Sequence, residues 1–336
     1  MRRFSLFVVC AALLMGCSDR SFIGKRYDNF TAYYNTFYNA QKAFEKGVEA
    51  IDQSEQPVDR TTYLSLFGAP AQASNTQAFE DAIGKSADVL REHPNSKWVD
   101  DALMMIGKSY FYQRNYVGAE QKFREVMGLD SGLEGEARFW LARALIAAGR
   151  YAAADEHLRA SLSLDEDFGR WAAMMSLAQG ELAVQRENWS GAAEALARGL
   201  DGDVGGEEAA QAAFLLGQVE ETRGNFEAAT AAYERAAEYR SRYELNYAAR
   251  ISAIRTKGLH GQPEEALSEL RDMETADKNF EKRDELRLLR GRLYQATGRL
   301  DEARRIYREL LYGDDASRQG GVSGRVHYAL AELYRD

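Results

Sequence analysis

The chain has 336 residues, of which 45% are hydrophobic and 28% charged, and its formal net charge is −9 at pH 7. This apolar content excludes a disordered chain, and the acidic balance argues against a nucleic-acid binder or a protein held to anionic lipid by a basic surface. Only four prolines interrupt long stretches rich in alanine, leucine, glutamate and arginine, so we expect an all-α protein.

The first predicted element is a secretory signal over residues 1–16. Two arginines precede the apolar run Phe4 to Met15, which is too short for a permanent membrane helix but typical of the centre of a signal peptide. Residues 14–17, LMGC, resemble a bacterial lipobox. This resemblance implies cleavage before Cys17, lipidation of its thiol and a short lipidated linker, residues 17–26. The alternative is an ordinary signal peptide with an accidental cysteine.

The two cysteines leave no intramolecular disulfide, because Cys10 departs with the signal and Cys17 carries lipid. Membrane attachment is then covalent, and at about 0.8 kcal/mol per buried methylene the two or more chains of a bacterial lipoprotein hold firmly. Ser18 after the lipidated cysteine fits sorting to the outer membrane, with the protein facing the periplasm. The nearby Asp19 leaves display on the cell surface as an alternative.

Residues 27–98 are predicted to form an N-terminal helical hairpin with a long insertion. Its first helix spans Asn29 to Ile51 and is rich in aromatic residues, and its second spans Gln77 to His93. The insertion, residues 52–76, contains two prolines and the apolar residues Leu64, Leu66 and Phe67. Because long loops within compact hairpins are often functional, we favour a loop that packs or binds something.

A repeat of 35 to 38 residues runs through residues 99–313. It is marked by an alanine shortly after a turn, found at Ala119, Ala154, Ala192, Ala229, Ala266 and Ala303. In most units a small residue precedes this alanine by twelve positions, at Gly107, Ala142, Gly180, Gly217 and Gly291. A large residue follows it by four positions, at Phe123, Leu158, Leu196, Tyr233, Leu270 and Tyr307.

This spacing resembles the tetratricopeptide repeat, which implies a right-handed α-solenoid of helical hairpins. Gly107 and Ala119 would let two antiparallel helices approach closely, with Phe123 filling the gap toward the next hairpin. The unit around Ala266 diverges most, because Lys257 replaces an expected aromatic residue, and we interpret it as a hinge or a divergent copy. Residues 314–336 repeat the first-helix pattern and are expected to form a capping helix.

Signatures of catalysis are missing from the sequence. The four histidines lie in different units without an HExxH pattern, and there is no P-loop, dinucleotide fingerprint or GxSxG motif. A calcium-loop beginning at Asp201 has Ala212 where the bidentate glutamate belongs. We therefore expect no metal, no cofactor and no enzyme; the alternative is an enzyme with its site in residues 54–75.

The positive hypothesis is a binding groove along the first helices of the hairpins. By position in this class of repeat, the candidate groove residues are Met104, Lys108, Tyr112, Phe139, Arg143, Phe214, Gln218, Leu288, Arg292 and Gln295. Such a mixture suits an extended peptide or a helix lying along the groove. The alternative is ordinary packing or solvated surface.

Two further resemblances concern the N-terminal third. The segments YDNFTAYYNTFYNAQKAFEKGVEAI (27–51) and HPNSKWVDDALMMIGKSYFYQRNYVGAEQKF (93–123) are similar to the N-terminal region of the SprE/PorW lipoproteins of type IX secretion and gliding. The lipid anchor and HPNSKWVDDAL resemble, less specifically, BamD-like outer-membrane assembly lipoproteins. Both resemblances imply a periplasm-facing scaffold at the outer membrane.

The resulting hypothesis is a lipid-anchored, non-enzymatic scaffold that binds envelope proteins or peptides in outer-membrane assembly or protein secretion. It meets the membrane through the lipid on Cys17 and does not bind nucleic acid. An adaptor that recruits peptidoglycan-remodelling enzymes is the alternative within the same class.

Overall fold

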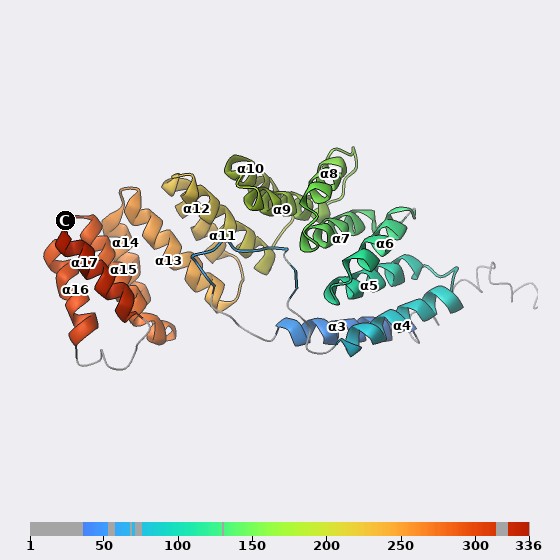
Figure 1. Ribbon diagram of the computed structural model, residues 1–336, viewed down its shortest axis with the longest axis horizontal. Coiled ribbons are helices and arrows are strands. Elements are labelled where there is room, and N and C mark those ends of the chain that lie inside the picture. Colours follow the sequence, from blue (N-terminus) through green and yellow to red (C-terminus); the bar gives the residue numbers. More distant parts are fainter. Residues whose placement is uncertain are drawn as a thin grey trace, which may run out of the picture. The chain divides into compact units, whose positions relative to one another are not determined.

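A computed structural model describes residues 36–52, 58–67, 69–70, 76–129, 131–313 and 322–335. Within these residues every regular element is helical, with fifteen α-helices and one 3₁₀ helix and no strand (Figure 1). The predicted all-α class of successive packed helical hairpins is confirmed. The predicted signal peptide and the lipidation site Cys17 lie outside the described residues.

The chain divides into two compact units that interleave along the sequence. The first unit takes residues up to 55 together with 65–185 and 201–204, and the second takes residues 56–64, 186–200 and 205–336. The insertion within the N-terminal hairpin therefore passes from the second unit to the first after Leu64.

The first unit contains seven of the described helices, and each packs on the next in chain order. They are α3 (Tyr38–Asp52), α4 (Gln77–Glu92), α5 (Val99–Tyr112), α6 (Tyr116–Met127), α7 (Glu134–Ala147), α8 (Tyr151–Leu162) and α9 (Arg170–Gln185). Helices α7 and α9 also pack on each other, as the first helices of neighbouring hairpins do in a stack.

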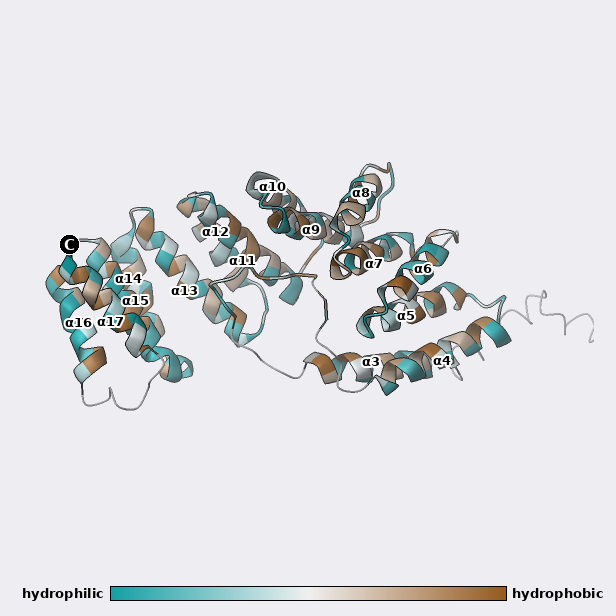
Figure 2. Ribbon diagram, in the orientation of Figure 1, coloured by the Kyte–Doolittle hydropathy of each residue, from teal (hydrophilic) through white to brown (hydrophobic). Residues whose placement is uncertain are grey.

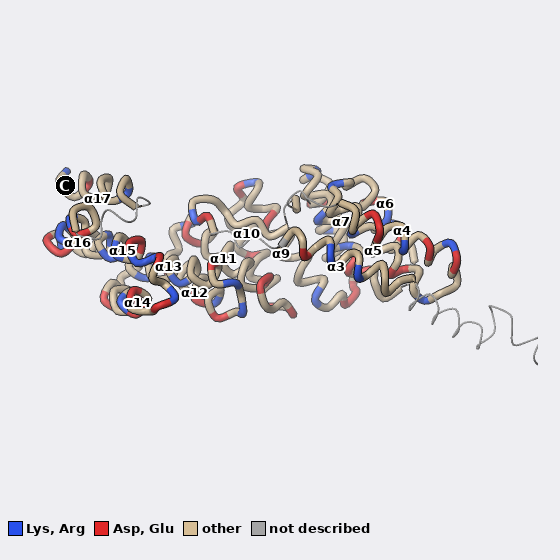
Figure 3. The backbone as a smooth tube through the Cα atoms, turned by 90° about the horizontal axis from the view of Figure 1, so that it is seen from below, with Lys and Arg blue, Asp and Glu red and all other residues tan. Residues whose placement is uncertain are grey.

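The second unit contains the remaining described helices. They are α10 (Trp189–Leu200), α11 (Gly206–Thr222), α12 (Phe226–Glu238), α13 (Tyr243–Leu259), α14 (Pro263–Thr275), η2 (Asp277–Lys282), α15 (Arg283–Ala296), α16 (Leu300–Tyr312) and α17 (Ser323–Arg335). Hydrophobic and hydrophilic residues alternate along these helices, as amphipathic packing requires (Figure 2). Charges of both signs are interspersed on the helices of each unit (Figure 3).

Small residues allow the two helices of a hairpin to approach closely. A Cβ atom added at Gly107 on α5 would lie 2.6 Å from the ring of Phe123 on α6, and one at Gly217 on α11 would lie 2.6 Å from the ring of Tyr233 on α12. The predicted role of Gly107 is confirmed. Phe123 lies against its own hairpin and also 6.1 Å, between ring centroids, from Trp140 of the next one.

A residue in the left-handed region ends the first helix of most hairpins. Glycine takes this position with φ of 71° at Gly149, 77° at Gly224 and 74° at Gly298. Arg114 and Glu187 adopt the same conformation at 61° and 56°. Because a side chain is strained there, glycine is the favoured residue at this turn.

In the most divergent repeat, around Ala266, Lys257 takes the place of the expected aromatic residue. Its side chain is only 6% exposed, and its Nζ lies 2.8 Å from Glu234, 3.2 Å from Glu265 and 2.6 Å from Glu269. Burial acts to lower the pKa of Lys257, but hydrogen bonds to these three carboxylates outweigh it and raise the pKa. An ion cluster therefore links α12, α13 and α14 within the second unit.

Candidate functional site

The described part of the insertion, residues 58–67 and 69–70, forms no helix or strand and lies against the repeat helices (Figure 1). Residues 58–64 contact the second unit, and residues 65–67 and 69–70 contact the first. Each of these two contacts is formed within one unit.

In the second unit, the side-chain amide of Gln218 on α11 binds the main chain on both sides of Tyr63. Its Oε1 accepts a hydrogen bond from the Leu64 N–H at 2.8 Å, and its Nε2 donates one to the Thr62 carbonyl at 2.8 Å. Gln218 is only 8% exposed, so these partners replace water that its amide has lost. The Gln218 amide thus binds main-chain groups, which are the same whatever side chains the segment carries.

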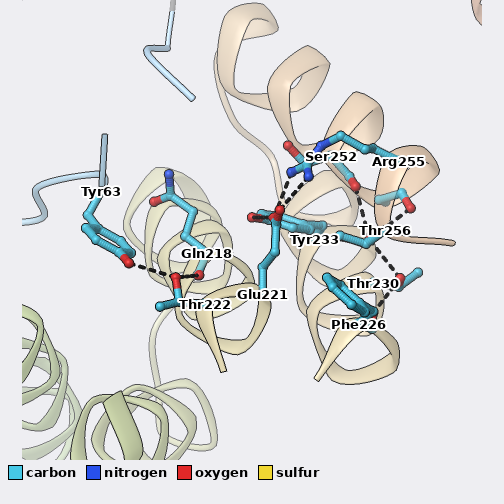
Figure 4. A network of polar contacts seen from close by, with 11 residues as sticks. Tyr63, Gln218, Glu221, Thr222, Phe226, Thr230, Tyr233, Ser252, Arg255 and Thr256 are labelled. Atoms are coloured by element: carbon cyan, nitrogen blue, oxygen red, sulfur yellow. Dashed lines mark hydrogen bonds and ion pairs between the residues drawn. The ribbon is translucent and has the colours of Figure 1, made fainter. Parts of the chain in front are cut away.

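The side chain of Tyr63 lies between α10 and α11. Its ring stacks on Trp189 with centroids 5.2 Å apart and planes at 30°, and its hydroxyl lies 2.7 Å from Thr222 Oγ1. Thr222 Oγ1 donates its own proton to the Gln218 carbonyl at 3.0 Å, so the Tyr63 hydroxyl donates to Thr222 (Figure 4). Both the ring and the hydroxyl group of Tyr63 therefore make contacts within the second unit.

Arg60 anchors the other end of the segment. Its guanidinium pairs with the carboxylate of Glu285 on α15, whose second oxygen accepts a hydrogen bond from the Tyr247 hydroxyl at 3.0 Å. Asp59 Oδ1 accepts from the Thr61 N–H at 2.8 Å and from the Thr61 hydroxyl at 2.6 Å, which closes a local turn. These hydrogen bonds from Thr61 lower the pKa of Asp59.

A cavity of about 340 Å³ adjoins Arg60 and Thr61 in the second unit. Leu288 and Arg292 of α15 line it, together with Arg255 of α13. Glu221 on α11 holds the Arg255 guanidinium with both carboxylate oxygens (Figure 4). The cavity therefore combines apolar side chains with arginines, two of which are paired with carboxylates of its lining, Arg255 with Glu221 and Arg60 with Glu285.

In the first unit, the carboxylate of Glu181 on α9 binds three donors of the insertion. Its Oε1 accepts from the Ser65 hydroxyl at 2.6 Å and from the Leu66 N–H at 2.9 Å, and its Oε2 accepts from the Phe67 N–H at 2.8 Å. Glu181 is 2% exposed, and burial raises the pKa of its carboxyl even though these hydrogen bonds and the charge of Arg143 act to lower it.

Phe67 is the apolar anchor of this half. Its side chain is 5% exposed, packs edge-on against Phe139 on α7 with ring centroids 5.2 Å apart, and has the Arg143 guanidinium 5.6 Å from its ring centroid. Arg114 donates a hydrogen bond to the Pro70 carbonyl at 2.7 Å. The contact therefore combines main-chain hydrogen bonds with one buried aromatic side chain.

Of the predicted groove residues, Phe139, Arg143 and Gln218 contact the insertion directly. Leu288 and Arg292 line the cavity beside Arg60. That these positions bind a partner protein stays a prediction.

The other predicted groove residues lie within the packing of the repeats. Phe214 is fully buried against Tyr233, Tyr112 stacks on Phe79 and Met104 is buried. Lys108 pairs with Glu136, and Gln295 accepts a hydrogen bond from the Tyr307 hydroxyl at 3.1 Å.

The residues that sequence reasoning missed are Glu181, Thr222, Trp189, Glu285 and Arg255. The repeat register contained a signal for two of them, because Glu181 and Arg255 occupy the same repeat position as Lys108, Arg143 and Gln218. This position follows the small residue of the first helix.

No group of three or more histidine, cysteine, aspartate or glutamate side chains within the described residues is placed to hold a metal ion. None of the described helices combines the length and the apolar character needed to cross a membrane.

Comparisons with known proteins bear on the repeats. Tetratricopeptide-repeat family models match residues 110–178, 177–243 and 284–312, so the chain carries tetratricopeptide repeats. No curated protein matches the chain.

Similar solved structures include a tetratricopeptide repeat protein from Parabacteroides merdae, at 14% identity and a TM-score of 0.40, covering 89% of this chain and 100% of that one. The apo form of RapI has 14% identity and a TM-score of 0.42, covering 80% of this chain and 95% of its own. The Cut9–Hcn1 hetero-tetramer of the APC/C has 13% identity and a TM-score of 0.41, covering 94% and 60%.

Proposed function

We propose that this chain with tetratricopeptide repeats is a lipid-anchored scaffold that holds other cell-envelope proteins through extended peptide segments. The observation that carries this proposal is the binding of non-helical main chain by the buried side chains of Gln218 and Glu181. Every peptide offers main-chain N–H and C=O groups, so helices that bind one extended segment in this way can accept others.

The proposed anchor is the lipid on Cys17, and the proposed location is the periplasmic face of the outer membrane. The LMGC tetrapeptide and Ser18 support both statements. The proposed setting is outer-membrane assembly or protein secretion, which the similarity of segments 27–51 and 93–123 to the SprE/PorW lipoproteins and the weaker similarity to BamD-like lipoproteins support.

Acyl labelling in a bacterial host tests the anchor. The wild-type chain should incorporate a labelled fatty acid and fractionate with the outer membrane, and Cys17→Ser should lose both properties. Cys10→Ser is the matched control, because it changes the other cysteine and should keep both. Labelling of Cys17→Ser equal to that of the wild type would contradict the anchor.

Crosslinking in intact cells followed by purification of the lipidated chain tests the partners. Outer-membrane barrels or secretion subunits among the captured proteins support the proposed scaffold. Capture of peptidoglycan hydrolases alone would instead indicate the adaptor that recruits cell-wall enzymes.

The enzymatic alternative places the site in residues 54–75. Tetratricopeptide repeats typically form non-catalytic scaffolds, and the described residues of the insertion are bound to the repeat helices. A turnover that disappears when this insertion is excised, with the helical circular dichroism intact, would favour the enzyme.

A further inference from the structure

Residues 60–64 are bound to the second unit as a ligand would be, and not as part of its core. Thr61, Thr62 and Tyr63 remain exposed, whereas the Gln218 amide that binds their main chain is buried. The segment is held by main-chain hydrogen bonds to Gln218 and by two side-chain anchors, Arg60 and Tyr63.

We propose that this face of α10, α11 and α15 is a peptide-binding site, that residues 60–64 are its resident occupant, and that a partner segment with the pattern Arg-x-x-Tyr displaces them. This inference rests on the proposed scaffold function and adds the class of partner and its regulation. Without a partner, residues 60–64 occupy the site, and a partner segment binds by displacing them.

The anchors define the partner chemistry. Glu285 selects a positive charge, and Trp189 with Thr222 selects a tyrosine three residues later. The Gln218 amide fixes the register between them, because it spans the carbonyl before the tyrosine and the N–H after it. The partner is therefore an extended basic and aromatic segment of a protein.

Displacement of residues 60–64 by a partner segment is favoured over their release without a replacement. Release of the segment without a replacement breaks both main-chain hydrogen bonds of Gln218. An incoming chain supplies the same carbonyl and N–H groups. The resident segment competes at an effective concentration on the order of millimolar, since it is tethered to the same chain. It therefore lowers the apparent affinity of any free peptide.

Fluorescence anisotropy with a labelled hexapeptide, DRTTYL, the sequence of residues 59–64, tests the site on the full-length chain. The variant Arg60→Ser/Tyr63→Ser removes both resident anchors and should bind this peptide at least about tenfold more tightly than the wild type. A scrambled peptide of the same composition is the control and should bind neither protein. We call this double variant the opened variant, and far-UV circular dichroism establishes that it is folded.

Gln218→Ala in the opened variant provides the site control, because it removes both main-chain hydrogen bonds. It should weaken peptide binding by about tenfold or more. Hydrogen exchange gives a second measurement on the wild type. The Leu64 N–H, which donates to Gln218, should exchange faster when the hexapeptide is present in excess.

Equal affinity of the hexapeptide for the wild type and the opened variant would overturn resident occlusion. Absence of binding to the folded opened variant, with the exchange of Leu64 unchanged in the wild type, would overturn the site itself. Crosslinked envelope partners with a negative peptide assay would leave the scaffold standing and remove only this inference. Peptide binding without captured envelope partners would leave the peptide site standing and count against the envelope scaffold.

Discussion

Gly107 and Phe123 are in contact across the α5–α6 hairpin, because a Cβ at Gly107 would lie 2.6 Å from the Phe123 ring. The next hairpin has Ala142 and Leu158 at the same two repeat positions. Its first helix thus carries a residue larger than glycine, and its second helix carries one smaller than phenylalanine. Gly107→Ala overpacks this contact and should lower the free energy of unfolding by about 1–3 kcal/mol, measured by urea denaturation.

The double variant Gly107→Ala/Phe123→Leu recreates the Ala142–Leu158 pair and separates overpacking from other effects. Its destabilisation should be smaller than the sum of the two single variants by about 1 kcal/mol. Strict additivity would show that the two side chains do not compete for the same space.

A second prediction concerns glycine-to-alanine substitution at two positions of the first unit, Gly149 in a turn and Gly84 in a helix. The expected effects on stability are opposite. Gly149 has φ of 71°, and a Cβ added there would point into open space; Gly84 is equally open but lies within α4. Gly149→Ala should lower the free energy of unfolding by about 1 kcal/mol, because alanine is strained in the left-handed region.

Gly84→Ala is the matched control and should raise the free energy of unfolding by about 0.5–1 kcal/mol, because glycine inside a helix costs conformational entropy. Urea midpoints measure both. A stabilised Gly149→Ala variant would contradict the assigned turn conformation.

The hairpins could be predicted from the sequence because their packing is periodic. Each repeat places a small residue and a large residue at fixed offsets, so the contact that joins Gly217 to Tyr233 recurs where the spacing recurs. Lys257 departs from the pattern, and its ion cluster could not be predicted because it depends on Glu234, Glu265 and Glu269 from two other helices.

The docking of the insertion could not be predicted in the same way. Residues 60–64 have no hydrophobic period, and Gln218 binds their main chain, which leaves no signature in side-chain identity. The position of Gln218 on the inner side of its helix follows from the repeat register. Glu181 has the same repeat position, but an acidic residue there gives no indication that Ser65, Leu66 and Phe67 bury it.

The pKa of Asp101 predicts a pH dependence of stability in the first unit. Burial, with the charges of Asp100 and Glu136, raises the pKa of Asp101 from 3.8 to about 6, against the opposing effect of Lys108 and Lys97. The folded chain therefore binds this proton more tightly than the unfolded chain. Its favourable contribution is complete below pH 3.8 and is lost as the pH rises through about 6.

Asp101→Asn removes this titration. Because Asp101 is half-buried, the variant should be more stable than the wild type by about 1–2 kcal/mol at pH 8, and the difference should shrink as the pH falls through 6. Urea denaturation at several pH values measures it. Asp81→Asn, at an exposed carboxylate of α4, is the control and should show no such trend. A difference that grows on acidification would contradict the assigned direction.

Glu181 supplies the last prediction, which concerns the local stability of the insertion. Both of its carboxylate oxygens accept hydrogen bonds from the main chain, one from Leu66 and the other from Phe67. In Glu181→Gln one of these oxygens becomes an amide nitrogen, so one N–H of the insertion faces a donor and loses its acceptor. The mismatch costs about 1–3 kcal/mol, which corresponds to exchange of the Leu66 and Phe67 amides about ten- to a hundredfold faster than in the wild type.

Hydrogen exchange followed by NMR measures this difference between Glu181→Gln and the wild type. Glu125→Gln makes the same chemical change on α6, where the carboxylate pairs with Lys122 of the same helix. It is the matched control and should leave the Leu66 and Phe67 amides protected. Unchanged exchange in Glu181→Gln would show that the Phe67 side chain, packed on Phe139, holds this part of the insertion in place without the carboxylate.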